Sequence, residues 1–178
     1  VVMVGEMRDI ETAQIGIQSS LTGHLVLSTV HTNNAVAAIT RLRDMGIESF
    51  LLSSSLRTII SQRLVRRLCS KCKKRSKPSS ESVLIFNLNK ESEVYTSIGC
   101  ESCSNTGYQG RIAIAECLQV DKNLKDLIHN NASENQISDY VFRDNQSIDQ
   151  ASVSLIIKGV TSCEEIIRVN NIKEDASI

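Results

Sequence analysis

The sequence predicts an α/β fold for residues 1–68, and two observations lead to this prediction. Short hydrophobic runs at residues 1–4 and 24–30 have the composition of buried strands. Between and after these runs, residues 9–20 and 34–45 repeat apolar side chains at helical spacing. Buried strands joined by amphipathic helices are typical of a mainly parallel sheet that is covered by helices.

Polar residues at the ends of these segments predict where each helix begins and ends. Asp9 is expected to cap the first helix, and Gly23 to terminate it. Asn33 or Asn34 is expected to cap the second helix, which ends at Gly46. A longer helix is then expected from Phe50 to Leu68. Its inward positions are Leu52, Leu56, Ile59, Ile60, Arg63 and Leu64.

The rest of the chain differs in character. Residues 69–110 contain two cysteine pairs, the only proline and a polar stretch, which predict an irregular module without a large core of its own. Residues 111–120 alternate apolar and polar positions as a strand does, and helices are expected to follow. These are capped by Asp121, by a Ser133/Gln136 capping box and by a Thr161/Glu164 capping box, with a frayed tail after Asn170. The predicted domains are therefore 1–68, 69–110 and 111–178.

Composition limits the classes of protein to which this chain can belong. Its 178 residues include no Trp, three Phe and three Tyr, so any core is built from aliphatic side chains. No stretch approaches the roughly 20 apolar residues that span a bilayer. The chain shows no signal peptide and begins at Val1 inside a predicted strand, so we expect a truncated start.

The charge is unevenly distributed, although the formal net charge is zero. Residues 63–77 carry eight Lys or Arg and no acid, which leaves 12 basic and 20 acidic residues elsewhere. Such a run is most often a solvated loop face, and the alternative is attraction to an anionic membrane surface or an acidic partner. Nucleic acid is not expected, because the run lacks aromatic residues on which bases could stack.

The strongest chemical pattern in the chain is Cys69-x-x-Cys72 followed by Cys100-x-x-Cys103. Two intervening residues let one tight turn present both thiolates to one metal, and two such turns complete a tetrahedral Zn²⁺ site. The pairs are 27 residues apart, more than the usual spacing of roughly 15–20. Redox dithiols and unligated thiols are the alternatives. Cys117 and Cys163 lie alone in apolar segments and are expected to be small core residues.

Glu6 follows the first predicted strand in the run Val1-Val2-Met3-Val4-Gly5-Glu6. A P-loop nucleoside triphosphatase places its Walker B acid, which orients Mg²⁺ and the attacking water, at the carboxyl end of such a strand. The alternative is an acid that only caps the following helix. No G-x-x-x-x-G-K-[ST] phosphate loop occurs in the 178 residues.

His24 and His31 lie at the two ends of the second predicted strand. Because they are seven residues apart, an ideal strand would point them to opposite faces. His31 follows the carboxyl end, where open α/β sheets bind ligands. From position alone, a turn or core role is favoured for each histidine.

Several blocks in one order resemble the secretion ATPases of the type II secretion and type IV pilus superfamily. These blocks are Val4–Ala13, which resembles the Walker B region of that family, Gly23–Asn33, which resembles its histidine box, Thr40–Glu48, Gln62–Cys69, Gly107–Arg111 and Gly159–Glu165. The resemblance covers nearly the whole chain. Arg41–Glu48 is more similar to the type II secretion branch than to the pilus-extension branch.

The resemblance implies the carboxyl-terminal half of a RecA-like P-loop ATPase domain, with an inserted four-cysteine zinc module and a helical carboxyl-terminal subdomain. It implies that Gly5 and Glu6 belong to the Mg²⁺–ATP site, since the family shares a glycine before the acid. It implies a γ-phosphate sensor at His31 and coupling to the neighbouring segment at His24. All four cysteine positions match the zinc module of the family.

The intact protein is then expected to be a homohexamer on the cytoplasmic face of the bacterial inner membrane. There, ATP hydrolysis would drive domain rotations that move the secretion or pilus assembly platform. The phosphate loop, the catalytic base and the amino-terminal arginines are expected upstream of Val1, so this polypeptide alone is not expected to hydrolyse ATP. The alternative is a zinc-stabilised binding module, or a remnant, that contacts an acidic partner through residues 63–77.

Overall fold

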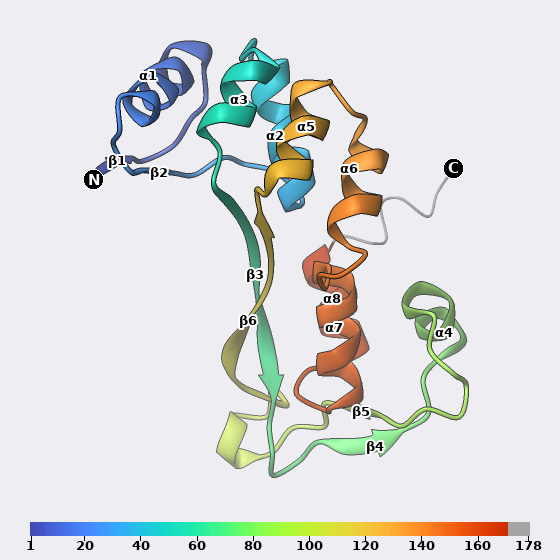
Figure 1. Ribbon diagram of the computed structural model, residues 1–178. Coiled ribbons are helices and arrows are strands. Elements are labelled where there is room, and N and C mark those ends of the chain that lie inside the picture. Colours follow the sequence, from blue (N-terminus) through green and yellow to red (C-terminus); the bar gives the residue numbers. More distant parts are fainter. Residues whose placement is uncertain (171–178) are drawn as a thin grey trace. The chain divides into compact units, whose positions relative to one another are not determined.

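The computed structural model of the protein describes residues 1–170, and the predicted frayed tail lies outside this part (Figure 1). The chain divides into two compact units. Unit 1 comprises residues 1–61 and 116–145, and unit 2 comprises residues 62–115 and the chain from Gln146 onward. The predicted division at residues 68 and 110 follows the order of the chain, whereas each unit combines two separate segments. The functional meaning of that predicted division stays a prediction.

Unit 1 begins with the predicted strand pair. Strand β1 (Val2–Val4) pairs in parallel with β2 (Val26–Ser28), and Met3 lies opposite Leu27. Helix α1 (Ile10–Leu21) connects them and packs against one face of the pair. Met3 and Leu27 point to the other face and are 77% and 50% exposed. Within the described residues, a helix therefore covers only one face of this pair.

The helices of unit 1 begin at the predicted caps. The Asp9 side chain accepts the Thr12 N–H at 2.8 Å at the start of α1, and Asn34 accepts the Ala37 N–H at 2.7 Å at the start of α2 (Ala35–Asp44). Asp121 caps α5 (Lys122–His129), and a Ser133/Gln136 capping box begins α6 (Glu134–Val141). Such caps satisfy N–H groups that have no partner within the helix. The predicted starts of these four helices are confirmed.

One aliphatic core holds unit 1 together, as the composition predicted. Its fully buried members come from all four of these helices and from the residues around them: Ala13, Ile39, Leu52, Leu118, Leu124, Ile128 and Ile137. Arg43 of α2 donates hydrogen bonds to the carbonyls of Ile128 and Ala132, both at 2.9 Å. The guanidinium thereby adds a second kind of donor to the Ile128 carbonyl, which also accepts the Asn131 N–H at 3.2 Å, and binds the Ala132 carbonyl just after α5.

The predicted helix from Phe50 to Leu68 is wrong over most of its length. Helix α3 covers only Ser49–Ser55, and Thr58–Leu68 forms the long strand β3. Exposed and inward positions alternate along most of β3, which is the period of a strand. The β-branched residues Thr58, Ile59, Ile60 and Val65 favour this conformation, and the helical spacing of apolar residues concealed their preference.

Strand β3 pairs with β6 (Tyr108–Gln119), the strand expected at residues 111–120. Hydrogen bonds just beyond the two ends of the ladder set its direction. Cys69 N–H donates to Gly107 O, and Val120 N–H donates to Arg57 O, both at 2.9 Å. Because the start of one strand lies beside the end of the other, the two strands run antiparallel.

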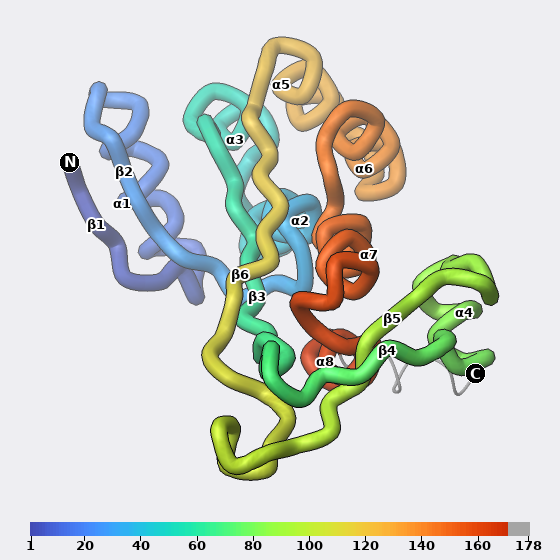
Figure 2. Tube along the Cα trace, turned by 90° about the horizontal axis from the view of Figure 1, so that it is seen from below, coloured from blue at the N-terminus to red at the C-terminus, as the bar shows by residue number. Residues whose placement is uncertain are grey.

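Unit 2 has more regular structure than an irregular module. Strand β4 (Lys74–Ser76) pairs antiparallel with β5 (Val94–Thr96), and α4 (Ser80–Phe86) lies in the connection between them (Figure 2). Helices α7 (Ile148–Ile157) and α8 (Cys163–Asn170) complete the unit. A second core joins these elements; its members include Val65, Phe86, Val94, Ile114, Ile156, Cys163 and Ile166. Segment 69–110 therefore shares a core with α7 and α8.

The cap of α8 differs from the prediction by one residue. Ser162, and not Thr161, accepts an N–H of the first turn, from Glu165 at 3.3 Å. The Thr161 hydroxyl instead donates to Arg66 O at 2.9 Å. The Glu165 side chain is fully buried and binds both Arg66 and Arg168, with nearest N–O distances of 2.6 and 2.7 Å. We call Arg66, Glu165 and Arg168 the buried ion cluster.

We expect Gly159→Ala to destabilise unit 2 more than Gly110→Ala does. Both glycines have positive φ, +62° and +74°, which costs an L-residue about 1–2 kcal/mol. A Cβ at Gly110 meets nothing within 4 Å, whereas one at Gly159 meets the Tyr95 ring at 2.4 Å, which adds about 1–3 kcal/mol. Denaturant unfolding of both variants measures the difference. Equal losses would show that the Tyr95 ring yields without cost.

We expect the stability contributed by Glu165 to disappear in acid. Burial raises the pKa of this carboxyl, but hydrogen bonds from Arg168 and Arg66 outweigh it and lower the pKa to about 2 from 4.5. The unfolded chain therefore takes up its proton first as the pH falls. The stabilisation is complete above pH 4.5 and is lost as the pH falls to about 2. The measurement is the free energy of unfolding of the wild type and of Glu165→Gln as a function of pH. The wild type should be more stable by about 2–3 kcal/mol at pH 7, and this difference should become smaller below pH 4.5.

Candidate functional site

The parallel pairing of β1 and β2 brings the residues after both strands to the same edge. Met7 N–H donates to Thr29 O at 3.0 Å, and the Thr29 hydroxyl donates to Gly5 O at 2.7 Å. These bonds extend the pairing beyond the strands, to the positions of Glu6 and His31. The Nε2 atom of His31 lies 2.9 Å from Oε1 of Glu6. The structure thus brings two of the predicted site residues into direct contact.

Arg8 completes this group, which we call the strand-edge cluster (Glu6, Arg8 and His31). Arg8 Nε donates to Oε2 of Glu6 at 2.6 Å. This bond lowers the pKa of the Glu6 carboxyl, with further lowering by the charges of Arg8 and His31. Glu6 is therefore an ionised acceptor at neutral pH. The Arg8 and His31 side chains are 76% and 87% exposed, so solvent reaches the cluster.

His24 lies away from the strand-edge cluster, at the start of β2. Its Nδ1 atom lies 3.2 Å from Ser19 O and 3.3 Å from the Thr22 hydroxyl, both near the end of α1. The two histidines thus lie beyond opposite ends of β2, as their positions in the sequence predicted. A Cβ on Gly5 would meet nothing within 4 Å, so local packing does not require glycine there. The functional roles of His24 and Gly5 stay predictions.

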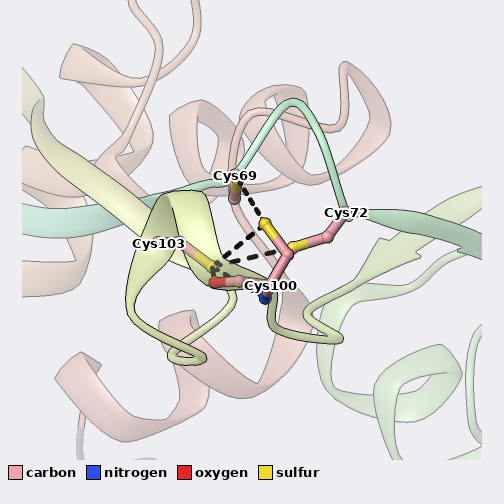
Figure 3. Close-up of side chains that lie close together, drawn as sticks. All are labelled: Cys69, Cys72, Cys100 and Cys103. Carbon is pink, nitrogen blue, oxygen red and sulfur yellow. Dashed lines mark hydrogen bonds between the residues drawn. The ribbon is translucent and has the colours of Figure 1, made fainter.

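The second group is the four-cysteine cluster (Cys69, Cys72, Cys100 and Cys103), shown in Figure 3. Cys69 follows β3 directly, and Cys72 precedes β4. Cys100 follows β5, and Cys103 ends the 3₁₀ turn η1 (Glu101–Cys103). The four Sγ atoms lie within 4.8 Å of one another. Sequence spacing predicted this convergence, although the connection between the pairs is long.

The sulfur geometry fits one tetrahedral ion. The Sγ–Sγ distances are 3.9 Å for Cys69–Cys100 and 3.8 Å for both Cys72–Cys103 and Cys100–Cys103. A tetrahedron with Zn–S bonds of about 2.3 Å has edges of about 3.8 Å. A disulfide requires about 2.05 Å, and all four cysteines are free thiols. The residues present therefore match a structural Zn²⁺ site in number, type and spacing.

Backbone N–H groups support a thiolate at Cys103. Burial raises the pKa of this thiol, but N–H donors from Cys100 and Gly107, each 3.2 Å from Sγ, outweigh it and lower the pKa to about 6. Burial raises the pKa of Cys72 to about 11. Backbone donors therefore favour the thiolate at Cys103, whereas four thiolates brought together require a cation.

The other two cysteines lie outside the cluster. Cys163 is buried in the core of unit 2, as expected, and burial raises the pKa of its thiol. Cys117 is exposed on β6, because the alternation of that strand turns it away from Leu118 and the core. Its predicted core position is wrong.

Much of the basic run is engaged inside unit 2. Arg63 donates to Val169 O, Arg66 pairs with Glu165, and Lys73 donates to Gly159 O. Arg75 and Lys77 pair with Glu93 and Glu91 at 3.0 and 2.7 Å. Arg67, Lys71 and Lys74 are exposed. The run therefore presents a smaller cationic surface than its eight charges indicate.

Sequence reasoning missed Arg8. Its signal was its position two residues after Glu6 in the extended segment before α1, where alternate side chains lie on one side of the chain. It also missed the buried ion cluster, in which Arg66 lies 99 positions before Glu165. Among residues 1–170, none of the helices combines the length and apolar character needed to cross a membrane.

A family model described as type II/IV secretion system protein matches residues 1–168. The chain belongs to this family. It is 49% identical over 171 residues to the type II secretion system ATPase E of Vibrio cholerae, covering 95% of this chain and 34% of that protein. It is 41% identical to the type IV pilus assembly ATPase TfpB of Acinetobacter baylyi, covering 95% of this chain and 30% of that protein. The chain thus spans about a third of the length of the curated relatives it matches.

Solved structures of ATPases share the fold of this family member. The pilus retraction motor PilT with bound ADP aligns at a TM-score of 0.64 and 25% identity, over 94% of this chain and 38% of that chain. The ATPase DotB of Legionella pneumophila aligns at a TM-score of 0.60 and 20% identity, over 98% of this chain and 38% of that chain. The predicted fold class, part of a secretion ATPase with a four-cysteine module and a helical carboxyl-terminal region, is confirmed.

Proposed function

We propose that this chain supplies the Walker B part of a secretion ATPase that couples ATP hydrolysis to type II protein secretion or type IV pilus assembly. The carrying observation is the strand-edge cluster, an ionised carboxylate in contact with His31 at the carboxyl edge of a parallel pair. Membership of the family supports the assignment of Glu6 as the Walker B acid. By the same analogy, the intact protein is a homohexamer. It acts on an assembly platform at the cytoplasmic face of the bacterial inner membrane.

Glu6 is the residue that would help to hold Mg²⁺. Protein sites usually bind this ion through one or two carboxylates, with waters and substrate phosphates completing the shell, so a single ionised carboxylate fits. Bound Mg²⁺ supplies charge neutralisation at the phosphates. Glu6 keeps its negative charge in the presence of Arg8 and can accept a hydrogen bond from a water. The exposed ring of His31 is available to contact a phosphate oxygen, while Gly5 leaves room beside the site.

Zinc is proposed to stabilise unit 2 through the four-cysteine cluster. The Sγ spacing supports this, because three Sγ–Sγ distances of 3.8–3.9 Å are close to the edge of a zinc–sulfur tetrahedron, about 3.8 Å. A structural metal that links segments 69–72 and 100–103 also closes the β4–β5 connection. Bound zinc supplies folding energy and no step of the ATPase reaction.

A zinc-stabilised binding module that contacts an acidic partner or anionic membrane is the second candidate. Its support is the part of the basic run that is exposed and forms no ion pair within residues 1–170, namely Arg67, Lys71 and Lys74. The paired state of Arg66, Arg75 and Lys77 weakens it. A chimera separates the candidates: these 170 residues replace the matching segment of the Vibrio cholerae relative. ATPase activity favours the motor, and a folded, zinc-loaded, inactive chimera favours the binding module.

We expect about one zinc per chain in the purified protein. Cys→Ser at any cluster position should reduce this content and destabilise unit 2, because three ligands retain little of the metal-linked folding energy. Metal analysis is the measurement, and Cys117→Ser is the matched control that should keep its zinc. Wild-type protein with well under about half a zinc per chain after gentle purification would contradict the proposal.

We expect Glu6→Gln in the chimera to lower the ATPase rate by roughly 10²-fold, a loss of about 3 kcal/mol, with ATP affinity retained. Glutamine keeps the shape of the side chain but removes its charge, whereas ground-state affinity depends mainly on the phosphate loop. His31→Ala should have the same effect more weakly, and Glu11→Gln on the exposed first turn of α1 should have none. A parallel fall of rate and affinity would make Glu6 a binding or folding residue.

We expect the 178-residue polypeptide by itself to bind ATP only in the millimolar range, where the binding free energy is about −4 kcal/mol. It lacks the backbone amides and lysine of a phosphate loop, which supply most of the phosphate-binding energy. Isothermal titration calorimetry is the test. Micromolar affinity would reveal a phosphate site outside the strand-edge cluster.

A further inference from the structure

The turn between α7 and α8, residues 159–162, is held by residues that flank the cysteine ligands. Leu68, which precedes Cys69, donates its N–H to Val160 O at 2.8 Å. Lys73, which follows Cys72, donates from Nζ to Gly159 O at 2.7 Å. The first cysteine pair is therefore bracketed by two hydrogen bonds to this one turn.

The second cysteine pair reaches the same turn through Tyr108. Cys103 Sγ accepts the Gly107 N–H at 3.2 Å, and Gly107 O accepts the Cys69 N–H at 2.9 Å. Gly107 has φ +76°, and a Cβ there would lie 2.5 Å from the Cβ of Ser97, so its position allows little adjustment. The next residue, Tyr108, makes a 2.8 Å hydrogen bond to the Ser162 hydroxyl. Both cysteine pairs thus determine where Tyr108 lies.

The turn and the start of α8 are buried through polar groups. Thr161, Ser162 and Glu165 are each at most 1% exposed. Ser162 caps α8, and Glu165 binds Arg66, whose guanidinium lies 4.1 Å from the centre of the Tyr108 ring. Buried polar groups are costly unless their hydrogen bonds are made. The order of this region therefore depends on contacts that are anchored at the four-cysteine cluster.

We infer that metal occupancy of the four-cysteine cluster controls the order of residues 159–170, which comprise the α7–α8 turn and α8. The inference rests on the metal binding proposed above. Four thiolates within 4.8 Å of one another repel each other unless a cation is bound between them. Separation of the two pairs displaces Leu68, Lys73 and Tyr108 from the turn. The cap of α8 and the buried ion cluster then lose their support.

The test is amide hydrogen exchange of the full chain, with zinc bound and after chelation. Exchange of residues 159–170 should become about tenfold faster or more when zinc is removed, a typical coupling between two sites. Exchange in α1 and α2 of unit 1 should stay unchanged. Unchanged exchange of residues 159–170 in protein that has lost its zinc would overturn the inference. Absence of zinc from the wild-type protein would overturn the metal proposal, and the inference with it.

A double variant tests the connection between the four-cysteine cluster and the α7–α8 turn without changing a cysteine. Lys73→Met with Tyr108→Phe keeps the aliphatic stem and the ring but removes both side-chain hydrogen bonds to the turn. Because coupling is reciprocal, the variant should show faster exchange at residues 159–170 with zinc bound. It should also bind zinc more weakly by a similar factor in competition with a chelator. Lys74→Met, an exposed neighbour, is the control. A double variant that matches wild type in both measurements would overturn the inference.

Discussion

The antiparallel pairing of β3 with β6 is the constraint on which both compact units depend. The two strands supply Val65 and Ile114 to the core of unit 2, and β6 supplies Leu118 to the core of unit 1. The same pairing places the end of β3 beside the start of β6, where Cys69 N–H meets Gly107 O. The two cysteine pairs, 27 residues apart in sequence, therefore start from neighbouring positions. Binding of both pairs to one ion therefore requires only that the connection between them folds locally, so the entropy cost of bringing the pairs together is small.

The features that could be predicted from the sequence are those that neighbouring residues determine. Helix starts at Asp9, Asn34, Asp121 and Ser133 followed from side chains that can accept first-turn N–H groups, and the zinc-type spacing followed from two short turns. The long helix through residue 68 failed because its apolar residues fit both periods. Pairing with a strand 50 residues later decided between them, as tertiary context commonly does for strands. Tertiary context also explains segment 69–110. Its few apolar residues do not form a large core by themselves, but they pack with residues of α7 and α8 in the core of unit 2.

The candidate site shows a similar division. The position of Glu6 and His31 could be predicted, because parallel strands end at one edge of a sheet. The contact of Glu6 with Arg8 was missed, because spacing by two residues is compatible with many arrangements outside a regular strand. The contact has a consequence for chemistry, since an arginine at 2.6 Å keeps the carboxylate charged while competing for the oxygens that a Mg²⁺ shell needs. Because the Arg8 side chain is 76% exposed, it has room to move away from Glu6 when Mg²⁺ binds there.

The basic run shows why charge counts along a sequence overstate a charged surface. Net charge is read along the chain, but β3 and β4 place most of these cations beside carboxylates, carbonyls or a tyrosine ring from distant segments. Arg66 illustrates the outcome, because its charge neutralises a buried Glu165 that no water can reach. Arg66 shares this carboxylate with Arg168, so its charge is balanced within the fold although its side chain is 41% exposed. Arg67, Lys71 and Lys74 are the exposed cations of the run that form no ion pair within residues 1–170, and they lie in or beside the first cysteine turn. The exposed charge of the run that no carboxylate balances within residues 1–170 therefore lies close to the four-cysteine cluster.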